Sequence, residues 1–298
     1  MKKSIVYFTK KITPEALLRI YNALGASLSG KIAVKISTGE PGGHNFLSPK
    51  LIAPLVNQLK GTIVECNTVY EGNRNTSEAH WKAIKDHGFL EIAPCDLMDE
   101  EGEIALPVRR GRHLTVNYAG SHLVNYQSML MLSHFKGHPM AGLGGALKNM
   151  AIGVASARGK GVIHTSGREE FPQEEIFTGD NDSFLESMAD ADQSVMNFMG
   201  SKNIVYINVA NRLSVDCDCV AHPEDPEMAD IGIFASLDPV AIDQACVTAV
   251  YQSNDPGKAA LIERMESRHG ILILEAAEAL ALGNREYELI DIDDQRLQ

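Results

Sequence analysis

The sequence predicts an α/β protein in which helices flank a mostly parallel sheet. Short runs rich in Val and Ile alternate with longer amphipathic runs, an order typical of strand–helix–strand units. Several amphipathic runs begin with a capping residue followed by Pro, which is a common helix start. Hydrophobic residues make up 44% and charged residues 22% of the 298 residues, so the chain has enough apolar side chains for a large core.

The first third of the chain alternates strands with helices. We expect strands in short runs rich in Val and Ile, at residues 4–8, 31–37 and 62–67. We expect amphipathic helices at residues 14–28, 49–59 and 76–88. Thr13 caps the first helix ahead of Pro14, whereas Pro54 lies inside the second. Since parallel strands need crossover connections, this order favours a sheet covered on both faces.

The rest of the chain continues the pattern with longer helices. Further strands are expected at residues 103–108, 113–118, 128–135, 203–210, 230–236 and 287–293. Further helices are expected at residues 147–154, 183–199, 238–252, 257–270 and 271–282. Asp238, followed by Pro239, begins one of them. We expect one contiguous α/β region over residues 1–298, divided into two lobes near residues 115–125 with the site between them.

The charge balance limits the partners. The chain has 39 acidic and 27 basic residues, so we expect neither a nucleic acid nor a membrane surface as partner, because both attract a basic face. No apolar run approaches the roughly 20 residues of a membrane-spanning helix. The apolar run near the N-terminus is too short for a signal peptide. Five scattered cysteines do not indicate a disulfide framework, so we expect a cytoplasmic protein, acting alone or as a homo-oligomer.

Residues 133–164 combine several glycines with three histidines and three lysines, and they include no acidic residue. Gly144 and Gly145 connect a strand to a helix, and free amides at a helix N-terminus favour an anion. His138, Lys148 and His164 are expected around this turn at the ends of strands, where parallel sheets bind ligands. Lysine can serve as a covalent tether or an anion contact, and neutral imidazole suits nickel, zinc or iron. The alternative is a glycine turn that serves only the fold.

Cys217 and Cys219 form a second candidate site. Residues i and i+2 of an extended segment point to the same side, so the two thiols can share a ligand. A zinc or iron–sulfur site needs further ligands, which the fold would have to bring close. The candidates for these ligands are His222, Cys66, Cys95 and Cys246. The alternative is a pair of thiols in a turn without any ligand.

Two more loops that follow predicted strands carry polar residues. Asn73 and Arg74 precede a helix capped by Asn75 or Thr76, and a guanidinium can clamp a carboxylate or phosphate. Glu40 and His44 lie in the loop before the second helix. A site assembled at one sheet edge requires polar residues on several such loops. We therefore expect these four residues, with Gly144 and Gly145, to bind a small anionic substrate.

Four long stretches resemble one family. They are VKISTGEPGGHNFLSP, CNTVYEGNRNTSEAH, residues 133–164 and DCDCVAHPEDPEMADIGIFASLDPVAIDQA. Together they resemble the family catalogued as domain of unknown function 362, over about residues 34–245, and many of its members are described as iron–sulfur-centre proteins. Many members carry four closely spaced cysteines in a region that here, at residues 187–203, has none. The resemblance therefore implies no ferredoxin-type cluster and no established reaction.

A more distant resemblance is to the nickel-dependent lactate racemase family. In that family a lysine in a G-G-x-x-K segment tethers a nickel pincer nucleotide, with one histidine upstream and one downstream. The segment GGALK is similar, and the match implies that Lys148 is the tether, His138 an acid/base and His164 a metal ligand. Asn73 stands where that family has a second catalytic histidine, while Arg74 is retained. Because racemisation needs a base on each face of the substrate carbon, this departure argues against racemisation, whereas metal or nucleotide binding does not depend on that histidine.

Two functional hypotheses follow. The first is a metal- or cofactor-dependent enzyme, of an isomerase or oxidoreductase-like kind, that acts on a small anionic metabolite. Histidine titrates near neutrality, so His138 would move a proton while His164 binds a nickel, zinc or iron ion. The second is a non-catalytic metal- or iron–sulfur-binding protein centred on Cys217 and Cys219. The first fails if His138, Lys148 and His164 lie far apart, and the second gains if the cysteines converge with a further ligand.

Overall fold

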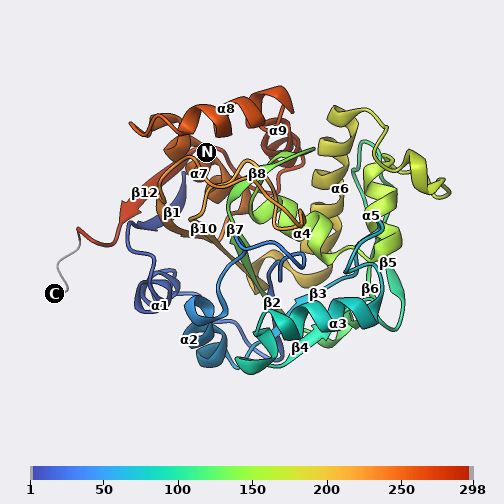
Figure 1. Cartoon of the computed structure of the whole chain (residues 1–298), viewed down its shortest axis with the longest axis horizontal. Helices are drawn as coiled ribbons and strands as arrows, with labels where there is room; N and C mark the ends of the chain where they lie inside the picture. The colour runs from blue at the N-terminus through green and yellow to red at the C-terminus, as the bar shows by residue number, and fades with distance from the viewer. Residues whose placement is uncertain (1–2, 295–298) are drawn as a thin grey trace.

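The computed structural model describes residues 3–294, and these residues form one eight-stranded sheet with two small hairpins beside it. The sheet order is β12-β1-β11-β10-β7-β2-β3-β4 (Figure 1). Its strands pair in parallel except β11, which is antiparallel to β1 and to β10. The strands are β1 (Ser4–Thr9), β2 (Ile32–Lys35), β3 (Thr62–Glu65), β4 (Cys95–Leu97), β7 (Ser128–His134), β10 (Ile204–Ala210), β11 (Gly232–Ser236) and β12 (Tyr287–Asp291).

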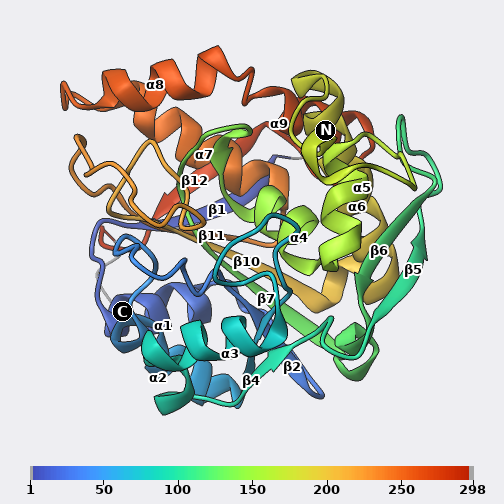
Figure 2. The same ribbon diagram turned by 45° about the vertical axis from the view of Figure 1, so that its right-hand side comes forward.

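Helices cover both faces of this sheet (Figure 2). The α-helices are α1 (Pro14–Ala23), α2 (Pro49–Leu59), α3 (Ser77–Asp86), α4 (Ala146–Val154), α5 (Ala157–His164), α6 (Asn181–Met199), α7 (Pro239–Gln252), α8 (Lys258–Ser267) and α9 (Leu272–Ala279). Short 3₁₀ turns are η1 (Phe89–Glu91), η2 (Ser121–Asn125), η3 (Gln173–Glu175) and η4 (Ser201–Asn203). The hairpins are β5 (Glu103–Pro107) with β6 (Val116–Gly120), and β8 (Lys136–His138) with β9 (Gly142–Gly144).

The core lies in two layers, one on each face of the sheet. Strand β7 is buried along its whole length, and its side chains alternate between the layers. Leu130 and Leu132 pack with the apolar sides of α1, α2 and α3. Met129 and Met131 pack on the other face with α4, α6 and α7. This two-sided burial explains why the strand sequence is a continuous apolar run, as is usual for parallel sheets.

Local signals begin several helices as the sequence predicts. The side chain of Thr13 accepts a hydrogen bond from the amide of Ala16, and Thr76 accepts one from Ala79. Asp238 caps α7 by accepting from two amides of its first turn. Helix α2 continues through Pro54. The α/β class, with a mostly parallel sheet, is therefore confirmed. No helix within residues 3–294 combines the length and the apolar character needed to cross a membrane.

Three elements differ from the expectation. Strand β4 and the β8–β9 hairpin have only three-residue strands, which give too short a pattern for a period to be read. Residues 157–164 form α5, so His164 lies in the last turn of a helix and not at a strand end. The expected lobe boundary falls in β6 and η2, yet β2 pairs directly with β7 from beyond that boundary. A division into two lobes stays a prediction.

The carboxyl ends of four neighbouring parallel strands meet at one edge of the sheet. These strands are β3, β2, β7 and β10, and they end at Glu65, Lys35, His134 and Ala210. The chain leaves each of them in a loop, and these are the loops that the sequence marks as polar or rich in glycine. The edge of a parallel sheet at the carboxyl ends of its strands is where ligands commonly bind.

Candidate functional site

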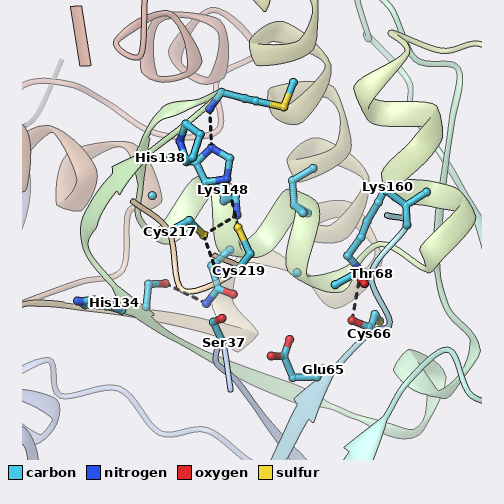
Figure 3. A pocket seen from close by; sticks show the side chains of 18 of the residues that line it. Ser37, Glu65, Cys66, Thr68, His134, His138, Lys148, Lys160, Cys217 and Cys219 are labelled. Atoms are coloured by element: carbon cyan, nitrogen blue, oxygen red, sulfur yellow. Dashed lines mark hydrogen bonds between the residues drawn. The ribbon is translucent and has the colours of Figure 1, made fainter. Parts of the chain in front are cut away.

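A pocket of about 250 Å³ lies at this edge (Figure 3). Its wall comes from the loops after β2, β3 and β7, from α4 and α5, and from the loop between β10 and β11. His138, Lys148 and His164 all line it, and so do Cys217 and Cys219. The two sites that the sequence offers as alternatives are therefore parts of one pocket. Segments more than 80 residues apart meet here because β10 pairs with β7 in parallel.

Cys217, Cys219 and His138 form the tightest cluster of the pocket. One ligand atom of each lies within 4.8 Å of the others, and they are the single such His, Cys, Asp and Glu group among residues 3–294. The Sγ of Cys219 lies 4.0 Å from Nε2 of His138. The Sγ of Cys217 accepts from the backbone amide of Cys219 at 3.4 Å and from Nζ of Lys148 at 3.7 Å.

The surroundings of Cys217 favour its thiolate. A hydrogen bond from the Cys219 side chain lowers the pKa of Cys217 well below its ordinary value, and the positive charge of Lys148 lowers it further. The same hydrogen bond raises the pKa of Cys219. The pair therefore shares one proton, with the negative charge on Cys217. A thiolate of this kind is both a nucleophile and a metal ligand.

The ring of His138 has a defined tautomer. Its Nδ1 accepts hydrogen bonds from the amides of Met140 at 3.1 Å and Ala141 at 2.9 Å. Burial lowers the pKa of His138, and the nearby Lys148 lowers it further, so the ring is neutral near pH 7. Because Nδ1 is occupied as an acceptor, the remaining proton is on Nε2, the nitrogen near the sulfur atoms. His138 thus presents a hydrogen-bond donor to the pocket.

His164 is a second neutral imidazole in the wall. Its ring stacks on Phe184 with centroids 4.3 Å apart and meets Phe177 edge-on. Burial lowers the pKa of His164 to about 3. Its buried Nδ1 has no hydrogen-bond partner in the described part of the chain. Buried polar atoms normally have a hydrogen-bond partner, so this unpaired nitrogen sets His164 apart from an ordinary core residue.

An ion-pair cluster fixes the loop that carries the cysteines. Asp218, between the two cysteines, accepts from Nδ1 of His134 and from Nζ of Lys136, both at 2.8 Å. Burial alone would raise the pKa of Asp218, but the positive charges of His134 and Lys136 outweigh it and lower the pKa to about 2. The alternation His134, Lys136, His138 along an extended chain places two side chains on Asp218 and the third beside the sulfur atoms.

A second buried ion-pair cluster lies on the β2–β3 side. Nζ of Lys35 donates to Glu65 at 2.8 Å, and Nε of Arg74 donates to Glu40 at 2.8 Å. Nη1 of Arg74 also lies 3.6 Å from Glu65. Burial would raise the pKa of Glu65, but Lys35 and its other positive neighbours lower it to about 2. Arg74 is therefore neutralised inside the protein, and its guanidinium ties the loops after β2 and β3 together.

The glycine turn before α4 holds a carboxylate of the protein itself. Oδ1 and Oδ2 of Asp243 accept from the amides of Ala146 at 2.8 Å and Leu147 at 3.0 Å. A side chain at Gly145 would begin 2.4 Å from Asp243, which explains the glycine there. The first amides of α4, which the sequence assigns to a substrate anion through Gly144 and Gly145, thus already have an anionic partner.

The predicted residues fall into two groups. His138, Lys148, His164, Cys217 and Cys219 meet in the pocket, whose lining also includes Arg74, Gly144 and Gly145. Glu40, Asn73 and His44 are not part of the lining. The carboxylate of Glu40 accepts from the amide of Asn73 and from Arg74, which makes it a loop contact. His44 is exposed and pairs with Asp225 at 3.3 Å. His222 is not part of the cluster that Cys217, Cys219 and His138 form.

Several residues of the pocket were not singled out in the sequence. They are Lys35, Glu65, Lys136 and Lys160, together with Asp218, which is not part of the lining but pairs with Lys136. Lys35 and Glu65 each stand at the end of an otherwise apolar strand, so a charge in a buried strand was the available signal. Lys160 is one of the three lysines of residues 133–164, but it stands on α5, a helix that the sequence did not predict, so no role was assigned to it.

Comparison with known proteins gives a family and distant solved structures. No curated protein matches the chain. Two solved structures are the lactate racemase apoprotein from Thermoanaerobacterium thermosaccharolyticum (12% identity, 78% of this chain and 54% of that one, TM-score 0.44) and a Thermotoga maritima protein (10%, 89% and 58%, 0.40). The chain thus spans little more than half of either. A family model described as domain of unknown function (DUF362) matches residues 32–248, and the chain belongs to that family.

Proposed function

We propose that this protein is an enzyme that binds a transition metal, or a cofactor that carries one, and acts on a small anionic substrate. The observation that supports this most directly is that Cys217, Cys219 and His138 meet at the wall of one pocket, beside Lys148. Soft ligands and groups with displaced pKa values that gather in a single pocket are typical of a catalytic site. Structural metal sites are usually closed, whereas this cluster borders open space.

The sulfur atoms fit a soft transition metal. The ligand atoms of the cluster lie within 4.8 Å of one another. Two thiolates, each about 2.3 Å from a tetrahedral zinc ion, lie roughly 3.8 Å apart, so little movement is needed. Cys217 is already in a field that favours its thiolate. Cys219 gives up its proton when a metal replaces the hydrogen bond between the two side chains. Nickel, zinc and iron all accept such ligands.

The two histidines have different roles in this proposal. The Nε2–H of His138 donates a hydrogen bond, either to sulfur or to a substrate oxygen on which negative charge develops. This differs from the acid/base role expected from the sequence, in which His138 moves a proton, since Nδ1 of His138 is held by two amides. His164 lies outside the three-residue group. We therefore assign His164, which lines the pocket, to contact with the substrate or with a larger cofactor, and not to an ion held by both sulfur atoms.

A bound metal would polarise a substrate oxygen as a Lewis acid. The chain's own groups prepare the pocket for that chemistry. The ammonium of Lys148 adds positive charge beside the sulfur atoms. The wall of the pocket also has an apolar part, formed by Val69, Ile152 and Phe177. Apolar surroundings lower the local dielectric constant and strengthen the interactions between charges.

A second candidate function is non-catalytic metal or iron–sulfur binding on the cysteine pair. The convergence of Cys217 and Cys219 with His138 also favours it. The cluster supplies two thiolates, whereas a ferredoxin-type centre is held by four. Cys66, Cys95 and Cys246 do not belong to the group. The pocket beside the cysteines, whose wall also holds the neutral imidazole of His164 and several lysines, is the reason that we prefer the enzyme.

Elemental analysis of protein purified from its native host tests the proposal. We expect stoichiometric nickel, zinc or iron, which the double variant Cys217→Ser/Cys219→Ser loses. Cys95→Ser is the matched control, because Cys95 is a half-buried thiol outside the pocket. Titration of the metal-free protein with Co²⁺ adds a second readout, since a thiolate–cobalt charge-transfer band should appear in wild type and in Cys95→Ser only.

The outcomes separate the candidates. Iron with acid-labile sulfide would move the function to the iron–sulfur alternative. Metal retained in the double cysteine variant would place the ion elsewhere and would reject the proposed ligands. Wild-type protein from the native host that carries no metal, and that gives no cobalt band, would reject both candidates.

A further inference from the structure

Most of the positively charged side chains in the wall of the pocket have a negatively charged partner. The lysine and arginine side chains that line it are Lys35, Arg74, Lys136, Lys148 and Lys160. Lys35 pairs with Glu65, Arg74 with Glu40, and Lys136 with Asp218, each at 2.8 Å. Lys148 lies against the Cys217 sulfur, whose thiolate is favoured. Four of these cations therefore have a negative partner.

Lys160 is the exception. Lys160 is 6% exposed, and its Nζ donates to the carbonyls of Ala155 at 2.6 Å and Cys66 at 3.4 Å. No carboxylate within residues 3–294 forms an ion pair with it. An ammonium carries three donors, so one N–H remains for the pocket. A buried charge without an opposite charge is costly, and such a group in a pocket wall is a candidate for binding a ligand of opposite charge.

The groups around Lys160 do not replace that charge. Those that act on it most strongly are Cys66, Asp99, Lys35 and Glu65, and His164 and His80 also lie within range. The carboxylate of Asp99 accepts from the amides of Asn67 and Ala157, both at 2.9 Å, so it caps α5 and ties the loop after β3. Glu65 is shared between Lys35 and Arg74. Burial lowers the pKa of Lys160, which agrees with an ammonium that lacks a partner.

We infer that the ammonium of Lys160 binds the anionic group of the substrate, a carboxylate or a phosphate, at the end of the pocket opposite Cys217 and Cys219. Figure 3 shows Lys160 and Thr68 on the far side of the pocket from the two sulfur atoms. The hydroxyl of Thr68, which bonds the carbonyl of Tyr70 at 3.3 Å, lies on the same side as a second polar group. The inference rests on the proposed function, because it identifies which residue holds the substrate of that site.

This assignment gives the substrate a direction. Its charged group lies at Lys160, and the atoms that react face Nε2 of His138 and the ammonium of Lys148. It also replaces the earlier expectation that Arg74 and the glycine amides hold the anion. Arg74 is neutralised by Glu40, and the amides of α4 are bound to Asp243. A bidentate carboxylate contact is worth more to a free guanidinium than to one already paired.

Isothermal titration calorimetry with acetate and with inorganic phosphate tests the inference, with chloride as the reference anion. Acetate represents a carboxylate, and phosphate represents a phosphoryl group. The anion that binds more tightly identifies the class of anionic group on the substrate. Lys160→Met should lower the affinity for the preferred anion about 10- to 100-fold, which is the usual contribution of a charge-assisted hydrogen bond. Lys160→Arg should retain most of the binding. Lys202→Met is the control, because it removes the same charge from an exposed position on η4.

A second measurement on unmodified protein guards against a variant that fails to fold. Saturating acetate or phosphate should slow reductive methylation of Lys160, read by peptide mass spectrometry, more than that of Lys202. Unchanged affinity in Lys160→Met would overturn the inference. Wild-type protein that binds neither anion would overturn it as well, and so would equal methylation rates with and without the anion.

The test also separates this inference from the proposed function. Lys160→Met should leave the cobalt band of the metal-free protein unchanged, because Lys160 lies away from the sulfur atoms (Figure 3). Cys217→Ser/Cys219→Ser should lose the cobalt band yet still bind the anion. If wild-type protein binds the anion but shows no cobalt band, the metal proposal alone would be rejected. A normal band with no effect of Lys160→Met on anion binding would reject the anion site alone.

Discussion

Nζ of Lys148 lies 3.7 Å from Sγ of Cys217, although 68 residues separate them in the chain. The contact joins the glycine-rich stretch after β7 to the C-x-C stretch after β10. Because these two strands run parallel and adjacent, their carboxyl ends deliver both segments to the same place. Lys148 is therefore the positive partner of the Cys217 thiolate. The sequence of either segment alone does not predict this contact.

Replacing Lys148 with Met should raise the pKa of Cys217. The ammonium favours the thiolate, so its loss removes part of the stabilisation that now holds the pKa low. We expect the ultraviolet absorbance of the Cys217 thiolate, followed against pH in metal-free protein, to develop at higher pH in Lys148→Met. Cys217→Ser should remove that absorbance step. The same titration midpoint in wild type and Lys148→Met would contradict the assigned contact.

Replacing Gly145 with Ala should destabilise the protein by about 2–3 kcal/mol, the usual cost of disrupting a buried charged hydrogen-bond network. The new Cβ would lie 2.4 Å from Oδ1 of Asp243 and would push the carboxylate off the amides of Ala146 and Leu147. Gly144→Ala is the control, since its Cβ would begin 3.4 Å from the Lys136 side chain, which is an ordinary van der Waals contact. Urea unfolding measures both, and equal losses would argue against the Asp243 contact.

Most of the fold could be predicted from the sequence because its signals are local. The caps at Thr13, Thr76 and Asp238 act within one turn of chain, and each appears in the structure. The apolar runs of β7 and β10 are long enough for their type to be read. The β8–β9 hairpin and β4 escaped prediction, since three residues give no period.

The candidate site was predictable in its residue types and much less so in its pairings. Cys217 and Lys148 belong to two segments that the sequence presents as separate sites, but the structure brings them into contact. The third member of the cysteine cluster is His138 and not His222. Arg74 was expected to face a substrate, but Glu40 neutralises it. Such pairings depend on strand order and loop paths, which a single sequence does not specify. Lys160 was counted among the lysines of residues 133–164, but its place in the pocket was not predicted because helix α5 was not predicted.

Replacing His80 with Gln should make the protein less sensitive to acid. Burial lowers the pKa of His80 to about 3, so the folded state keeps the ring neutral while the unfolded chain protonates it near 6.5. Below pH 6.5 the unfolded state therefore binds the extra proton, and the free energy of unfolding falls by up to about 1.4 kcal/mol per pH unit from this residue. The contribution is complete above pH 6.5 and is lost toward pH 3.

Urea unfolding between pH 7 and pH 4 checks this prediction. Gln can still donate to Oδ1 of Asn67, which the ring now contacts at 3.1 Å, so the fold should be retained. As the pH falls, the free energy of unfolding of His80→Gln should decline less steeply than that of wild type. The difference in slope should correspond to about one proton fewer taken up on unfolding. Parallel lines for the two proteins would show that His80 titrates alike in the folded and unfolded states.

Replacing Glu65 with Leu should cost about 3–5 kcal/mol, because it leaves the ammonium of Lys35 buried without its carboxylate. Lys35 is 1% exposed, and its Nζ donates to Glu65, to Oδ1 of Asn149 and to the carbonyl of Ile36. Lys35→Met/Glu65→Leu should recover much of that loss, since removing both charges also removes the cost of burying one. Urea unfolding of wild type, both single variants and the double variant completes the cycle. Additive losses would mean that the two charges do not depend on each other, and the account of a paired charge cluster beneath the pocket would then be wrong.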